Sequence, residues 1–196
     1  MSSHLHHHAR ALVVSLVAAA LLLLGAASAS AAVTTKVTTK YYSFTGQTVA
    51  DMRASINRVR PGAQDASAWG TVNWRWRRAI SGSGRCSFSR TSVALSEKFV
   101  MPQWASREGA PADVQNTWDT YLARLWVHEK GHQTLSLKAA KAVSAKLNKM
   151  GSYATCAALD KAANKAASAI MARQQKAQAA YDARTNHGAT QGAVFG

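Results

Sequence analysis

Two histidines and a glutamate in the second half of the chain have the spacing of a metal-binding helix. His128, Glu129 and His132 form the pattern His-Glu-x-x-His. Residues four apart lie on the same face of a helix, so both imidazoles can bind one zinc ion. The carboxylate of Glu129 would then project beside the metal, where it can hold and deprotonate a bound water molecule. The pattern therefore predicts two metal ligands and a general base.

Few other histidines are available as a third metal ligand. Of the seven histidines, four lie within the first eight residues, and the others are His128, His132 and His187. A catalytic zinc site uses three protein ligands and keeps one position open. His187 is therefore a candidate for the third ligand. The alternative is that His128 and His132 are ordinary surface residues of a helix and His187 belongs to a tail.

The known extended forms of this zinc-binding motif do not identify a third ligand in this chain. A metzincin needs Gly at position 135 and His at position 138, where this chain has Leu135 and Lys138. A thermolysin-type site uses a downstream Glu, and no Glu follows Glu129. Asp160 would lie too far along an antiparallel second helix, about 15 Å from His132 at 1.5 Å per residue.

Two candidates remain at the end of that second helix. A straight helix would pass the metal near Met171 and overshoot it by roughly 15 Å at Tyr181, after which a loop could bring His187 back. We therefore expect His187 as the third ligand, with Asp182 as the alternative. If His187 binds zinc, Asp182 can orient a ligating imidazole and Tyr181 can donate to a developing oxyanion.

Residues 1–32 have the composition of a secretory signal peptide. Arg10 precedes a mostly apolar run over residues 11–24, which small residues follow. The run is short for a membrane span, although an uncleaved anchor is the alternative. Nothing later is apolar for long enough to span a membrane. We therefore expect a secreted or extracytoplasmic protein whose single domain covers residues 33–196.

The net charge is +15, and removal of the signal segment, with one Arg and no acidic residue, leaves +14. Such a surface favours binding to anionic partners, such as acidic wall polymers, acidic substrates or nucleic acid. The charge alone does not distinguish among these partners. An exported chain with two cysteines usually joins them, so we expect a disulfide between Cys86 and Cys156. Two free thiols acting as metal ligands would need a second Cys at ligand spacing.

Hydrophobic periodicity predicts an α+β fold with a small antiparallel sheet. The expected strands cover residues 33–44, 69–80 and 86–100, and the expected helices cover 48–59, 111–151 and 155–184. In the run Trp74–Arg78 aromatic and cationic residues alternate, which on a half-buried strand places Trp inward and Arg outward. We therefore expect no specific nucleic-acid binding. Gly131 inside the metal-bearing helix indicates that another element, such as a strand, packs closely there.

The chain also resembles a bacterial domain-of-unknown-function family described as predicted secreted zinc-dependent proteases. The resemblance rests on the His128–His132 helix with Trp118 and Tyr121 before it, and on a tail that contains Tyr181, Asp182, Thr185, His187, Gly188, Gln191 and Gly192. It covers residues from about 41 to 195. It implies a zincin-like fold, one catalytic zinc ion and export.

Together these features predict a zinc-dependent hydrolase of peptide bonds. Its partner would be a peptide or protein substrate, and an edge strand from residues 86–100 could align it by main-chain hydrogen bonds. One alternative is a zinc amidase that acts on cell-wall peptides. The other is a non-catalytic basic protein that binds the cell envelope, with zinc as a structural element.

Overall fold

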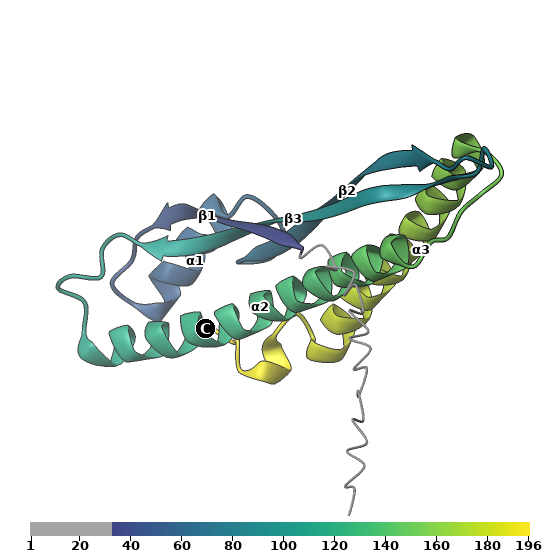
Figure 1. The fold of residues 1–196 in the computed structure, drawn as a ribbon. Helices are drawn as coiled ribbons and strands as arrows, with labels where there is room; N and C mark the ends of the chain where they lie inside the picture. Colours follow the sequence, from purple (N-terminus) through teal and green to yellow (C-terminus); the bar gives the residue numbers. More distant parts are fainter. Residues whose placement is uncertain (1–32) are drawn as a thin grey trace, which may run out of the picture.

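A computed structural model describes residues 33–196, so the expected signal segment 1–32 lies outside the described residues. The elements are β1 (Thr34–Phe44), α1 (Val49–Val59), β2 (Ser67–Ile80), β3 (Cys86–Trp104), α2 (Ala112–Asn148), α3 (Cys156–Thr185) and the 3-10 helix η1 (Ala189–Gln191). The sheet forms one layer, and α2 and α3 run along one of its faces (Figure 1). The predicted α+β fold is confirmed. Within residues 33–196 no helix has the length and apolar character needed to cross a membrane.

The three strands form a mixed sheet in the order β1-β3-β2. β2 and β3 pair in antiparallel fashion, as expected for a hairpin, but β1 pairs with β3 in parallel. α1 connects β1 to β2, and β2 runs in the direction opposite to β1. The hairpin turn after β2 reverses the chain again, so β3 runs parallel to β1. The expectation that the strand from residue 86 onward forms an edge was wrong. That strand, β3, is central, and β1 and β2 form the two edges of the sheet.

The core lies between the sheet and the helices. Alternate residues of β3 are buried against the helices over most of the strand. One apolar cluster includes Phe44, Met52, Ile56, Phe99, Met101, Trp118, Tyr121 and Phe195. The other includes Val72, Val93, Leu95, Ala140, Val143, Leu147, Ala163 and Ala167. The indole nitrogens of Trp74 and Trp76 donate to Asn164 and Asp160 of α3, so both rings face the helices as the alternation predicted.

The predicted disulfide between Cys86 and Cys156 is present, and it fixes the start of α3. Tyr153 also pairs with Cys86 through two backbone hydrogen bonds of 2.9 and 2.8 Å. The chain therefore continues past the end of α2 to the β2–β3 turn before α3 begins there (Figure 1). α3 is displaced along α2 as a result.

This displacement changes which part of α3 meets the metal-binding pattern. The side chain of His132 contacts Gln178, where a symmetric hairpin would have placed Met171. The difference of seven residues corresponds to about 10 Å of helix. The expected overshoot at Tyr181 was therefore wrong, and the last turns of α3 lie beside the pattern.

Candidate metal centre

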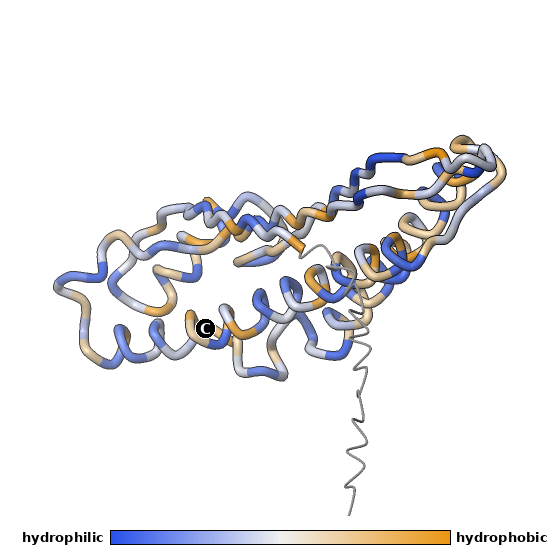
Figure 2. The backbone as a smooth tube through the Cα atoms, in the orientation of Figure 1, coloured by the Kyte–Doolittle hydropathy of each residue, from blue (hydrophilic) through white to orange (hydrophobic). Residues whose placement is uncertain are grey.

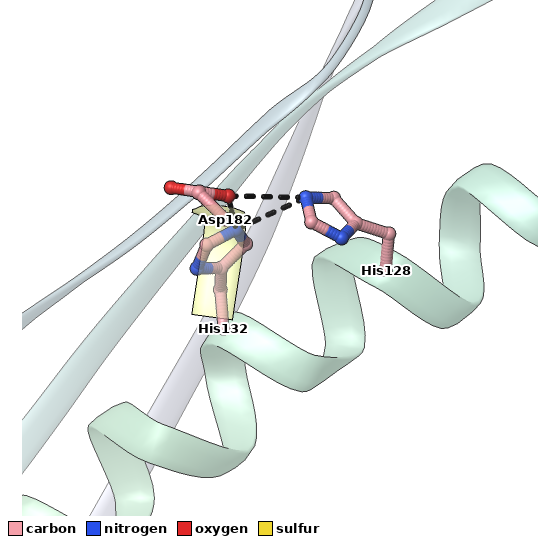
Figure 3. A group of neighbouring side chains, drawn as sticks. All are labelled: His128, His132 and Asp182. Carbon is pink, nitrogen blue, oxygen red and sulfur yellow. Dashed lines mark hydrogen bonds and ion pairs between the residues drawn. The ribbon is translucent and has the colours of Figure 1, made fainter. Parts of the chain in front are cut away.

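The two histidines of the pattern project from the middle of α2. His128 and His132 are 4% and 7% exposed, and their rings lie edge to face. Asp182 reaches the same point from the last turns of α3, and Figure 3 shows its carboxylate directed at both rings. The Oδ1 atom of Asp182 lies 3.3 Å from Nε2 of His128 and 2.9 Å from Nε2 of His132. The two Nε2 atoms are 3.2 Å apart.

These three separations suit a single metal ion. Bonds of 2.0–2.1 Å at tetrahedral angles place neighbouring ligand atoms roughly 3.3 Å apart. The Nε2 atoms of His128 and His132 and the Oδ1 atom of Asp182 approach this spacing without any rearrangement of the chain. The group could therefore hold a metal ion. Two imidazoles and one carboxylate leave a fourth tetrahedral position for a water molecule or a substrate.

Two glutamines orient the imidazoles. Nδ1 of His128 lies 3.0 Å from Oε1 of Gln191, and Nδ1 of His132 lies 2.7 Å from Oε1 of Gln178. An amide oxygen only accepts, so each ring donates its Nδ1–H and keeps the lone pair of Nε2 for a metal. The Nε2 group of Gln178 donates to the backbone carbonyl of His132, which fixes the orientation of that amide. Neither orienting role was predicted from the sequence, because no spacing rule marks these glutamines, although Gln191 belongs to the tail that carries the family resemblance.

Tyr181 explains the glycine in the middle of α2. Its ring stacks on that of His128 at 5.0 Å, and its hydroxyl donates to the His128 carbonyl at 3.1 Å. A Cβ atom on Gly131 would lie 2.0 Å from this hydroxyl oxygen, so no larger residue fits. The element expected to pack against Gly131 is thus α3 and not a strand. The predicted oxyanion role of Tyr181 receives no support, because its buried hydroxyl is already bonded to α2.

Glu129 lies next to the three candidate ligands and is 2% exposed. Its Oε2 atom has no hydrogen-bond partner among the described residues. Burial and the nearby charge of Asp182 raise the pKa of Glu129 to about 8. A carboxylate in such surroundings readily accepts a proton. The predicted general base therefore has a free oxygen beside the three candidate ligands, and its catalytic role remains a prediction.

His187 lies at the rim of this group. Its side chain is 51% exposed, and its Nδ1 atom is 3.7 Å from Oδ1 of Asp182. Asn186 and His187 both have left-handed backbone conformations, with φ of 45° and 50°, and they turn the chain away from α3. The structure gathers Asp182 with His128 and His132 and leaves His187 outside. Its assignment as a ligand remains a prediction.

An open cleft of about 680 Å³ leads to the centre. The free edge of β2, at residues 67–70, forms one wall together with Asp65, and Met171 and Gln174 of α3 line another part. A Cβ atom on Gly70 would lie 2.5 Å from Oε2 of Glu97. It would also lie 2.6 Å from the side chain of Ser136, so the glycine lets the edge strand pack closely against α2.

The fold and site define a class: an α+β protein in which two histidines and one aspartate could hold a metal ion, with a buried glutamate beside them. More particularly, the chain belongs to the family described as bacterial protein of unknown function (DUF922), whose model matches residues 39–188. The matched span contains all of the residues proposed to bind metal. No curated protein and no solved structure matches the chain. The expected bacterial domain-of-unknown-function family is confirmed, whereas its expected description as secreted zinc-dependent proteases is not, because the family description assigns no activity.

Proposed function

We propose that this protein is a secreted zinc-dependent metallopeptidase. The observation that carries the proposal is the arrangement of three ligand atoms, 2.9 to 3.3 Å apart, beside the unpartnered carboxylate oxygen of Glu129. Imidazole nitrogen and carboxylate oxygen are ordinary zinc donors. His128, His132 and Asp182 would hold the ion, with Gln178 and Gln191 orienting the imidazoles.

When bound, zinc would lower the pKa of a coordinated water to about 7 and polarise the carbonyl group of a substrate. Glu129 would take a proton from the attacking water onto its carboxylate and pass it to the leaving amine. The free edge of β2 offers unpaired backbone groups that can align an extended peptide across the cleft. β2 thus takes the role that the sequence analysis gave to residues 86–100.

The number of ligands favours catalysis over a purely structural metal. A structural zinc site is closed by four protein ligands, whereas this group offers three and opens to a cleft. A zinc amidase acting on cell-wall peptides would use the same groups. The two activities differ only in the substrate that fits the cleft.

The test compares Glu129→Gln with the wild type in zinc content and in hydrolysis of an unfolded protein and of purified wall peptide. We expect unchanged zinc content and a loss of turnover of about 100-fold or more. Glu108→Gln is the matched control, because Glu108 is an exposed acid far along the chain from the ligands. Full activity in Glu129→Gln would rule out the proposed mechanism. Hydrolysis of wall peptide alone would identify the amidase.

A further inference from the structure

One face of the sheet has no helix over it. α2 and α3 cover the opposite face, where Val93, Leu95 and Phe99 of β3 are buried (Figure 1). The residues between them in β3, such as Ser92 and Ser96, point outward. Residues paired in register share a face, so the strand pairing identifies the outward residues of β1 and β2.

The outward residues form a basic strip. Its cationic members are Lys36, Lys40, Arg75, Arg77, Arg90 and Lys98. The sole acidic residue of the three strands, Glu97, is 1% exposed and faces the helices. Within residues 33–196 none of the six cations forms an ion pair. The strip therefore has positive charge that no acidic side chain of the sheet compensates.

Two of these cations lie where repulsion is strongest. Arg77 of β2 is directly paired with Arg90 of β3, and Arg75 is two residues along on the same face. Like charges directly opposite each other on neighbouring strands destabilise a sheet. The hydrophilic run of β2 ahead of the hairpin turn is visible in Figure 2. Without an anion from outside the chain, this arrangement costs stability.

The shape of the strip suits a linear polymer. From Val100, which pairs with Lys40, to Arg90 the central strand advances ten residues, or about 33 Å. Short hydroxyl side chains lie between the cations, namely Thr71, Ser92 and Ser96. Hydroxyl and guanidinium groups are the usual donors to phosphate oxygens.

The strip does not suit nucleobases. A protein that binds single-stranded nucleic acid uses several aromatic side chains on which bases stack. Here Trp69 stands at one end, and the ammonium group of Lys98 lies 4.9 Å from its ring centre. Trp74 and Trp76 face the helices instead. The favoured polyanion is therefore one without bases.

We propose that the outer face of the sheet binds a linear phosphodiester polymer without bases, such as a poly(glycerol phosphate). A phosphodiester carries one permanent charge in each repeat, and its free oxygens match the paired donors of arginine. Binding on this face leaves the cleft beside β2 and α2 open. The site would hold the protein on an anionic polymer independently of any peptidase activity.

The test uses the full mature chain and fluorescent poly(glycerol phosphate) titrated at several NaCl concentrations. The variant Arg75→Gln, Arg77→Gln, Arg90→Gln removes three charges from the strip. The matched control, Lys141→Gln, Lys161→Gln, Lys165→Gln, removes three exposed charges from α2 and α3. We expect the strip variant to bind at least tenfold more weakly and its salt slope to fall by about 2, and the control to change by less than threefold.

Equal losses in the two variants would overturn the proposal, because net charge alone would then explain binding. Tighter binding of single-stranded DNA or of a polycarboxylate of equal length would also overturn it. Thermal unfolding shows whether the strip variant folds. Removal of the Arg77–Arg90 repulsion should leave its midpoint unchanged or raised. If that variant fails to fold, Arg75→Gln alone provides the same comparison against Lys141→Gln.

Discussion

Asp182 is the residue outside α2 that completes the candidate metal-binding group. Its Oδ1 atom lies within 3.3 Å of both imidazole nitrogens, whereas His187 is half exposed at the rim. We expect Asp182→Ala to weaken zinc binding by about 100-fold or more, since even the loss of a group behind a ligand costs about 10- to 100-fold. His187→Ala should change it by less than about tenfold. Competition with a zinc-binding dye measures both affinities.

The opposite result would identify His187 as the ligand. Loss of zinc in His187→Ala with retention in Asp182→Ala would mean that the loop after α3 closes over the ion. An Asp182→Asn variant separates charge from size, because an amide keeps the shape but binds zinc poorly.

The elements of this chain were easier to predict than their relative positions. The sequence predicted α2 and α3 to within a few residues, because the apolar positions recur at helical spacing and Gly151 separates the two segments. It also identified His128, Glu129 and His132, whose spacing is local. The choice between Asp182 and His187 could not be made in this way. It depends on the displacement of α3 along α2, and contacts of Tyr153 and Cys156 with β3 set that displacement.

The parallel pairing of β1 was missed for a similar reason. Alternation in residues 34–44 marks a strand but carries no information on its direction relative to β3. The glutamines that orient the imidazoles also escaped prediction. Their positions depend on α3 and on the turn at Gly188 and Gly192, where φ is 90° and 87°.

The disulfide should stabilise α3 and, through it, the metal centre. Cys86 and Cys156 are 70 residues apart, and in the chain-entropy model closing such a loop contributes about 4 kcal/mol. We expect the double variant Cys86→Ser, Cys156→Ser to lose about 2–5 kcal/mol of unfolding free energy in urea denaturation. Its zinc affinity should also fall, because Gln178 and Asp182 depend on the position of α3.

Arg85→Ala is a control for the same part of the molecule. Arg85 donates to Ser152 on the connection before α3, but it is exposed. Its loss should cost at most about 1 kcal/mol. An unfolding free energy that is the same in the disulfide variant and the wild type would show that packing alone fixes α3.

At the scale of the whole molecule, Asp65 joins parts of the chain that are distant in sequence. Its carboxylate accepts from Arg53 of α1, from Arg60 and from the hydroxyl of Tyr121 of α2. Its backbone carbonyl accepts from Tyr42 of β1 at 2.6 Å. Burial alone would raise the pKa of Asp65, but the hydrogen bonds from Tyr121 and the two arginines outweigh burial and lower it. The charged form therefore stabilises the folded state.

The sign of the pH dependence follows from this lowered pKa. Because the folded-state pKa lies below the ordinary value of 3.8, the contribution of Asp65 is fully present above about pH 4 and is lost as the pH falls through the folded-state value. We expect Asp65→Asn to lower the unfolding free energy by about 1 kcal/mol or more at pH 7, after allowance for screening by solvent. The difference from the wild type should shrink below pH 4. Urea denaturation between pH 2 and pH 7 measures it.

Asp119→Asn provides the matched acid-to-amide control for this experiment. Asp119 also pairs with an arginine, Arg107, but both side chains are about half exposed, at 53% and 46%. An exposed ion pair contributes at most about 1 kcal/mol and often less. Its removal should therefore shift the unfolding curves little at any pH. If Asp119→Asn reproduced the pH dependence of Asp65→Asn, the general charge balance of this basic chain would explain its acid sensitivity, and the junction at Asp65 would not.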